Sequence, residues 1–120
     1  EVTRDGDLIV VRLQGAENID VASRLWPTVI QACKEHNCYR VLGVADTTDP
    51  LSTLDAFDHA ELFQSLGIDH RYRIAWVELN PDAIEATSFT EIVLSNRALP
   101  GRLFTDEAAA RQWLLGEAAT

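Results

Sequence analysis

Basic residues and long apolar runs are scarce in this sequence, and each scarcity excludes a class of protein. The 120 residues include 10 Lys and Arg against 19 Asp and Glu, so the formal net charge is −9. The basic residues are spread along the chain, whereas proteins that bind nucleic acids or anionic membranes carry them in clusters. No apolar run approaches the roughly 20 residues that cross a bilayer. We therefore expect no nucleic-acid partner and no membrane insertion.

Cysteine is scarce as well. Cys33 and Cys38 are the only two, and their spacing does not match redox or zinc-ribbon motifs. Cys33 falls on the apolar face of a predicted helix, where burial raises the pKa of a thiol and suppresses its reactivity. With 47% hydrophobic residues, the chain can build a core without disulfides. The N-terminus does not resemble a signal peptide. These features predict two reduced thiols in a cytoplasmic protein.

Catalytic and cofactor-binding motifs are also missing. The chain has no Gly-x-Ser-x-Gly elbow and no phosphate-binding loop. Asp55 and His59 lie four residues apart on a predicted helix, so their side chains share one face. A protein metal site needs three or four ligands, so an exposed ion pair is the better interpretation of these two. We therefore expect no catalytic residues, no metal and no cofactor, which argues against an enzyme.

What the sequence does contain is a regular alternation of strand-like and helix-like segments. Strand-like runs occupy residues 8–13, 40–45, 73–79 and 102–104, and residues 1–4 can add a short hairpin strand. Amphipathic stretches occupy residues 20–37, 53–66, 81–93 and 106–114. A chain of this length fits one domain. The pattern predicts a single α/β domain over residues 1–120, with a four- to five-stranded, mostly parallel sheet and about four helices.

Four details of packing follow from the same pattern. Phe89 falls on the apolar stripe of the third helix and is expected to be buried. Pro27 lies within the first helix and predicts a kink there, or a helix that begins near Trp26. Trp26 is a candidate contact residue if it is exposed. Gly43 interrupts a strand-like run and indicates close packing against a helix.

The segment 46–53 is the best candidate for a functional site. It leaves the carboxyl end of a predicted buried strand and enters a helix, and open α/β sheets usually bind ligands or partners at that edge. Capping the helix needs one hydroxyl, so the other hydroxyls could meet a partner. An ordinary turn with capping residues is the alternative interpretation. The candidate partner- or ligand-binding residues are Asp46, Thr47, Thr48, Asp49, Ser52, Thr53 and Asp55.

In these features the chain resembles the STAS domain, the anti-sigma-factor-antagonist fold, and especially its bacterial STAS/SEC14-like branch. The resemblance rests on residues 8–15, 41–46, 51–54, 72–75 and 96–114. In the phospho-regulated members, a serine at the start of the second helix is phosphorylated within an Asp-Ser-Ser/Thr-Gly motif. Here Ser52 and Thr53 occupy the hydroxyl positions, whereas Leu51 and Leu54 replace the aspartate and the glycine.

The sequence thus predicts a non-enzymatic regulatory or protein-interaction domain that acts through the strand-end segment and the second helix. Its partner would be a protein, and a homodimer remains open. The alternative is a small carrier that binds an apolar or anionic metabolite under the second helix, which the SEC14-like resemblance also implies. A carrier would copurify with a ligand that native mass spectrometry detects, whereas an interaction domain would not.

Overall fold

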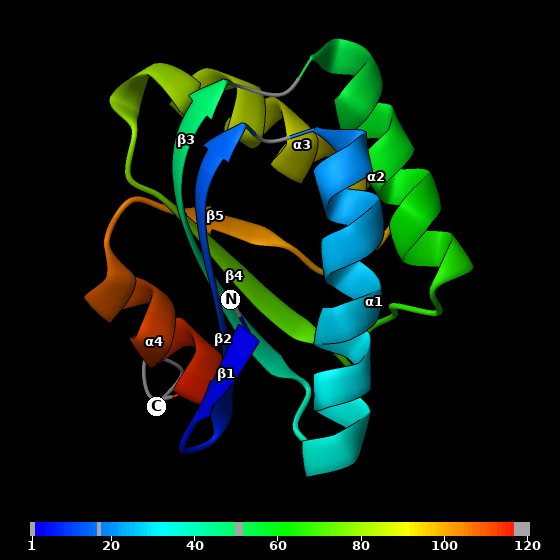
Figure 1. Cartoon of the computed structure of the whole chain (residues 1–120), viewed down its shortest axis with the longest axis vertical. Helices are drawn as coiled ribbons and strands as arrows, with labels where there is room; N and C mark the ends of the chain where they lie inside the picture. The colour runs from blue at the N-terminus through cyan, green and yellow to red at the C-terminus, as the bar shows by residue number, and fades with distance from the viewer. Residues whose placement is uncertain (1, 17, 50–51, 117–120) are drawn as a thin grey trace.

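A computed structural model describes residues 2–16, 18–49 and 52–116, the side chain of Asp49 excepted. Its elements alternate along the chain as the sequence pattern predicts (Figure 1). They are β1 (Val2–Asp5), β2 (Leu8–Ala16), α1 (Ile19–His36), β3 (Arg40–Asp49), α2 (Thr53–Ser65), β4 (Arg73–Glu78), the 3₁₀ turn η1 (Pro81–Ala83), α3 (Ile84–Asn96), β5 (Arg102–Phe104) and α4 (Glu107–Leu115).

The five strands form one sheet in the order β1-β2-β3-β4-β5. The sheet is mixed rather than mostly parallel, because β1 runs antiparallel to β2 while the other three pairings are parallel. The reason is local: Gly6 adopts a positive φ of 58° and closes a tight hairpin between the first two strands. The α/β class and the four helices are as predicted, and the parallel character is corrected by this hairpin.

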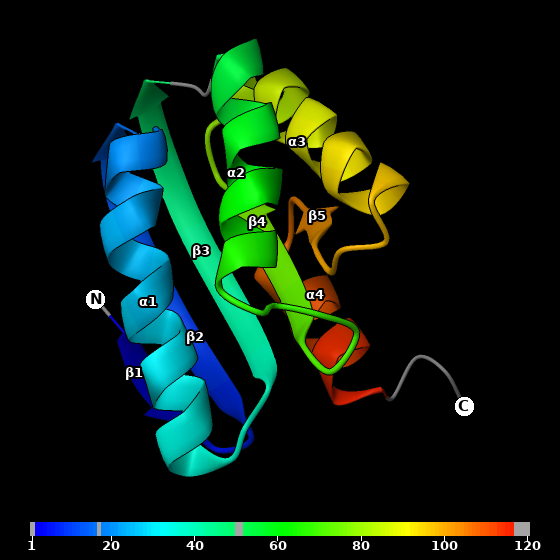
Figure 2. The same ribbon diagram turned by 90° about the vertical axis from the view of Figure 1, so that its right-hand side faces the viewer.

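Helices cover both faces of the sheet and bury a core on each. Helices α1, α2 and α3 cover one face, and α4 covers the other (Figures 1 and 2). Ile9, Val41 and Ile74 belong to the larger core under the three helices. Their strand neighbours Leu42 and Ala75 belong to the smaller core under α4. Strands that are apolar on both sides are typical of a sheet covered in this way.

The first helix begins earlier than its proline suggests. Asn18 caps α1, since its side-chain oxygen accepts a hydrogen bond from the amide of Val21 at 3.0 Å. The helix then continues through Pro27 to His36. Trp26 is buried on its inner face, with its ring centroid 4.8 Å from that of Phe63. It is therefore a core residue and not a contact surface.

Gly43, inside β3, packs against the neighbouring strand and not against a helix. Gly43 pairs in register with Trp76 of β4, and the indole lies against the glycine backbone. A β-carbon at this position would overlap the ring atoms Cε3 and Cζ3 of Trp76. The prediction of packing against a helix is therefore wrong. The glycine admits the largest side chain of the neighbouring strand.

Candidate functional site

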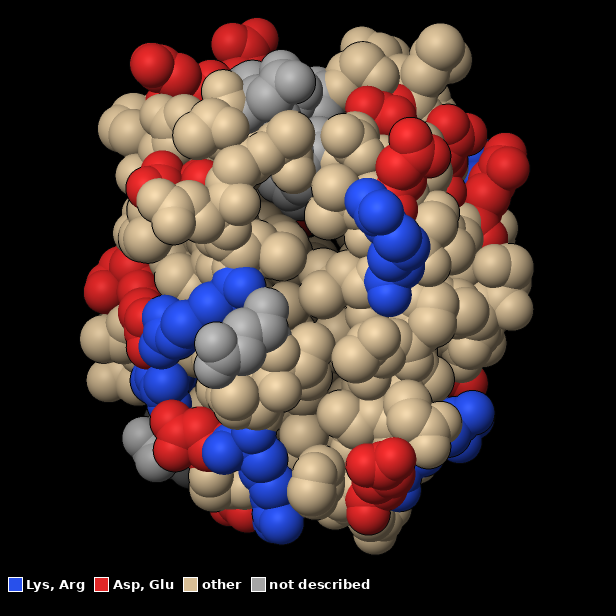
Figure 3. Space-filling model, viewed as in Figure 1, with Lys and Arg blue, Asp and Glu red and all other residues tan. Residues whose placement is uncertain are grey.

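The predicted site lies where the parallel strands finish, here called the carboxyl edge of the sheet (top of Figure 1). Strand β3 extends to Asp49 instead of ending at residue 45, so Asp46, Thr47 and Thr48 belong to the strand and not to a loop. Acidic side chains predominate along this upper edge (Figure 3). The opposite, amino edge of the sheet lies at the bottom of the same view.

A buried carboxylate organises the carboxyl edge. Glu78, at the end of β4, is only 2% exposed. Its Oε1 accepts a hydrogen bond from the hydroxyl of Thr47 at 2.6 Å, and its Oε2 accepts from the backbone amides of Thr47 at 3.1 Å and Asn80 at 3.2 Å. The side-chain amide of Asn80 donates to the carbonyl oxygen of Thr47. These bonds supply the partners that a buried charge requires, and they join β3 to β4.

Thr47 is therefore a structural residue. The sequence interpretation placed its hydroxyl in solvent, facing a partner, but the side chain is 1% exposed and bonded to Glu78. The error arose because the predicted strand ended four residues too early, at residue 45 instead of Asp49. Glu78 and Asn80 were missed altogether. The signal that could have found Glu78 is a single acidic residue that closes an otherwise apolar strand.

The start of α2 uses two more of the predicted residues for capping. The amide of Asp55 donates to Ser52 Oγ at 3.1 Å, and the amide of Ser52 donates to Asp55 Oδ2 at 3.3 Å. This reciprocal capping box satisfies amides that the helix start would otherwise leave unpaired. Asp46, Thr48 and Thr53 are exposed. The side chain of Asp49 lies outside the described part of the chain.

His59 does not form the exposed ion pair that its spacing from Asp55 suggests. Its side chain is buried, and Nδ1 donates to the backbone carbonyl of Asp55 at 2.7 Å. Because a carbonyl can only accept, this nitrogen carries the proton and Nε2 is an acceptor. Burial lowers the pKa of His59, against smaller opposing effects of Asp55 and Asp58. The imidazole is therefore neutral at pH 7.

The outer side of α2 and α3 exposes apolar side chains. We call Leu54, Phe57, Phe89 and Ile92 the α2–α3 face. Leu54 is 75% exposed and Ile92 is 52% exposed. The rings of Phe57 and Phe89 meet edge to face, with centroids 5.8 Å apart. Phe89 was expected inside. It points outward because the inner side of α3 is filled by Thr87, Thr90, Val93 and Leu94.

Beneath this face lies a small cavity of about 60 Å³, between the sheet and helices α1, α2 and α3. Its lining includes Trp26, His59, Phe63 and Trp76. The indole nitrogen Nε1 of Trp76 is buried and has no hydrogen-bond acceptor among the described residues. A buried donor without an acceptor is costly, so this atom would favour an occupant that carries one. The cavity lies under the second helix, where the carrier alternative expects it.

Known proteins add no further constraint on this site. The chain matches no protein-family model, no curated protein and no solved structure. Among the described residues, no three His, Cys, Asp or Glu side chains lie close enough together to hold a metal ion. None of the described helices has the length and apolar character to span a bilayer. The STAS-like relationship therefore stays a prediction, and the function has to be argued from geometry.

Proposed function

We propose that this chain is a non-enzymatic interaction domain that binds a basic protein partner through the α2–α3 face. The observation that carries the proposal is the Phe57–Phe89 pair on the surface, flanked by the exposed side chains of Leu54 and Ile92. Large apolar side chains that gather on a surface and carry a polar border are typical of protein contacts. A STAS-like regulatory role and a cytoplasmic location are part of the same proposal.

The negative charge around the α2–α3 face favours a basic partner. Helix α2 carries Asp55, Asp58 and Glu61, α3 carries Glu85 and Glu91, and neither helix contains a Lys or Arg. Asp46 adds an exposed carboxylate at the adjoining carboxyl edge. A partner with an apolar centre and a basic border complements this surface. A second copy of the chain would bring acidic borders together, so the charge argues against a symmetric dimer.

The test is capture of partners from the native host with two variants that carry the same chemical change. Leu54→Lys places a cation on the α2–α3 face, whereas Leu115→Lys places it at another exposed leucine, on α4. Because both leucines are exposed, both variants should fold. We expect a protein that the wild type and Leu115→Lys both retain and that Leu54→Lys loses. Once purified, that protein should bind the wild type less tightly as salt is raised.

Two results would overturn the proposal. One is a retained protein that Leu54→Lys still binds with unchanged affinity. The other is a wild-type dimer in light scattering that Leu54→Lys converts into a monomer, because the face would then serve self-association. Both measurements use the same purified variants.

The cavity under α2 supports a second candidate function, the small carrier. The observation in its favour is the unpartnered Nε1 of Trp76. At about 60 Å³ the cavity accommodates only a ligand of a few atoms in this conformation, since one water occupies about 30 Å³ of liquid. Native mass spectrometry of freshly purified protein tests this candidate. A bound mass that Trp76→Phe removes would support it, and a ligand-free spectrum would exclude it.

A further inference from the structure

Three arginines lie side by side at the amino edge of the sheet, far from the carboxyl edge in the fold. Arg40 begins β3, Arg73 begins β4 and Arg102 begins β5. Arg40 and Arg73 are register partners, and Arg102 pairs with Ala75, two residues along from Arg73. Because side chains alternate along a strand, all three point to the face that α4 covers. We call these three residues the arginine row.

None of these three guanidinium groups has a carboxylate within 4.0 Å among the described residues, although the chain is acidic. Three other arginines are paired: Arg12 with Glu107, Arg71 with Asp69, and Arg111 with Asp5 and Glu107. Arg4, Arg24 and Arg97 also have no carboxylate within 4.0 Å among the described residues. The arginine row differs from them because its three members begin three neighbouring strands.

Trp113 of α4 stacks on two members of the arginine row, Arg73 and Arg102. The guanidinium carbon of Arg73 lies 4.2 Å from the indole centroid, and that of Arg102 lies 5.7 Å from it. Stacking on an indole orients a guanidinium without using its hydrogen-bond donors. The Nε of Arg73 is buried and has no acceptor among the described residues. The stacking therefore positions Arg73 while its buried Nε–H lacks an acceptor in the described part of the chain.

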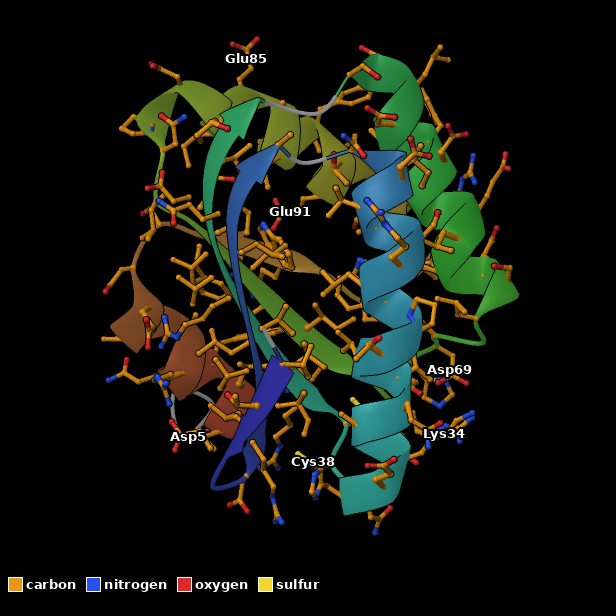
Figure 4. All side chains as sticks on the ribbon, viewed as in Figure 1. Asp5, Lys34, Cys38, Asp69, Glu85 and Glu91 are labelled. Atoms are coloured by element: carbon orange, nitrogen blue, oxygen red, sulfur yellow. The ribbon has the colours of Figure 1, made fainter. Side chains whose placement is uncertain are left out.

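The arginine row lines an open hollow of about 1160 Å³ at the amino edge. Cys38 lines this hollow. Figure 4 shows Cys38 near the bottom of the molecule and Glu85, at the carboxyl edge, at the top. Tyr39, Tyr72 and His70 line the hollow as well. Glu91 also reaches the hollow, but its Oε2 accepts a hydrogen bond from the amide of Leu103 at 2.6 Å. The hollow thus offers donors and aromatic surface together.

We propose that the arginine row binds a small organic anion that carries two or more phosphate or carboxylate groups. Like charges on directly paired residues of neighbouring strands repel each other, and an anion between the guanidinium groups removes that repulsion. Guanidinium groups bind both kinds of oxyanion through paired, charge-assisted hydrogen bonds. Neighbouring strands lie about 4.8 Å apart, so three strands span about 10 Å. A single oxyanion group is too small to meet all three arginines.

This site is independent of the α2–α3 face. None of its three arginines belongs to that face, and the arginine row attracts the opposite charge. Glu91 and Ile92 of α3 also line the hollow, so the variants that test the arginine row leave both of them unchanged. The arginine row can therefore be tested without a protein partner, and either proposal can fail while the other stands.

The experiment titrates tripolyphosphate and citrate, in separate arms, into the purified chain at low ionic strength, with calorimetry as the readout. Arg40→Gln and Arg102→Gln each remove one cation of the row, and both side chains are exposed. Arg24→Gln, at an exposed position on α1 outside the hollow, is the control with the same change in charge. Melting curves of the three variants establish that they fold. The NMR resonance of Arg73 Nε–H reports directly on contact with the anion.

We expect one ligand per chain for at least one of the two probes. Arg40→Gln and Arg102→Gln should each weaken binding about tenfold, the effect of losing one charge-assisted hydrogen bond, and Arg24→Gln should change it by less than about twofold. Saturation by tripolyphosphate alone identifies a phosphate ligand, and saturation by citrate alone identifies a carboxylate. The proposal is overturned if neither probe saturates below about 10 mM. It is also overturned if Arg24→Gln weakens binding as much as Arg40→Gln.

Discussion

The two edges of the sheet handle polar side chains in opposite ways. At the carboxyl edge, Glu78 and Thr47 bond each other, and Ser52 and Asp55 close a capping box. At the amino edge, Arg40, Arg73 and Arg102 have no carboxylate within salt-bridge distance among the described residues. Polar groups that are hydrogen-bonded within the fold stabilise it, whereas oriented polar groups without a protein partner can bind a ligand. Oriented polar groups without a protein partner therefore lie at the amino edge, whereas the sequence favoured the carboxyl edge as the binding site.

The α2–α3 face is a third kind of surface, and it differs from both edges of the sheet because its exposed side chains are apolar. Its apolar side chains have no hydrogen-bonding needs, so their exposure alone carries the inference. The acidic helices around it repel the anion that the arginine row attracts. One small domain therefore offers an acidic apolar face and a cationic hollow to two chemically different ligands.

The largest effect should come from removing the buried carboxylate of the carboxyl edge. Glu78→Ala leaves the Thr47 hydroxyl and two backbone amides without their acceptor, so we expect the free energy of unfolding to fall by about 3 kcal/mol. Glu78→Gln keeps one acceptor oxygen and should lose less. Urea denaturation measures both. A loss below about 0.5 kcal/mol for Glu78→Ala, as at an ordinary exposed site, would contradict the structural role of this edge.

Thr47 and Thr48 separate the structural from the exposed residues of the same edge. Thr47→Ala removes the hydroxyl that donates to Glu78, and we expect a loss of about 1–2 kcal/mol in unfolding free energy. Thr48 is exposed, so Thr48→Ala should change it by less than about 0.5 kcal/mol. Thermal and urea unfolding of the two single variants provide the comparison. Equal losses in both variants would mean that Thr47 is an ordinary surface residue.

The buried His59 should make the stability of the α2 region depend on pH. Burial holds the pKa of His59 below its unfolded value of about 6.5, so the unfolded chain binds the proton more readily. This contribution is complete above pH 6.5 and is lost as pH falls through the folded pKa, with a slope of up to about 1.4 kcal/mol per pH unit. Urea unfolding between pH 7.5 and 5 measures it, relative to a His59→Gln variant.

The exposed His70 at the amino edge is the matched control. His70→Gln makes the same substitution at an exposed position, and its pH dependence is measured alongside that of His59→Gln. If the stability of His59→Gln and of the wild type depends on pH in the same way, the pH dependence comes from another group. The burial of a neutral His59 imidazole would then be contradicted.

The smallest effect should distinguish the repelling arginines from the paired ones. Arg40→Gln relieves the repulsion from Arg73 and should raise the unfolding free energy by about 0.2–0.5 kcal/mol at low salt. Arg12→Gln breaks the pair with Glu107 and should lower it by about 0.2–1 kcal/mol. Both differences should shrink at high salt, since surface charges are screened. Changes of opposite sign in the unfolding free energy of the two variants would support repulsion between Arg40 and Arg73. A loss of stability in both variants would contradict it.

Much of the fold could be predicted from local signals. The hairpin strand before Leu8 and the burial of Cys33 follow from turn chemistry and helical periodicity. Burial raises the pKa of the Cys33 thiol to about 12, as the position of this residue on the apolar stripe predicts. The mostly parallel sheet was the point of failure: the hairpin strand was predicted, but the antiparallel pair that a hairpin brings was not carried into the description of the sheet.

The candidate site was less predictable than the fold. Asp46 and Thr48 are exposed, but they belong to β3 and not to a loop, and Thr47 faces inward. Periodicity identifies the apolar side of a helix without showing how much of it the sheet can cover. For that reason Phe89 was placed in the core although its ring lies on the surface.

By itself, the sequence determined the order and kind of the elements, since propensity, turns and caps act over a few neighbouring residues. Only the tertiary structure decided which distant side chains meet. Thr47 and Glu78 are 31 residues apart and bond through the register of β3 on β4. The arginines are dispersed along the chain, and parallel pairing of three strand starts gathers Arg40, Arg73 and Arg102 on one face. Strand register is a property of the folded sheet, so local sequence could not reveal either cluster.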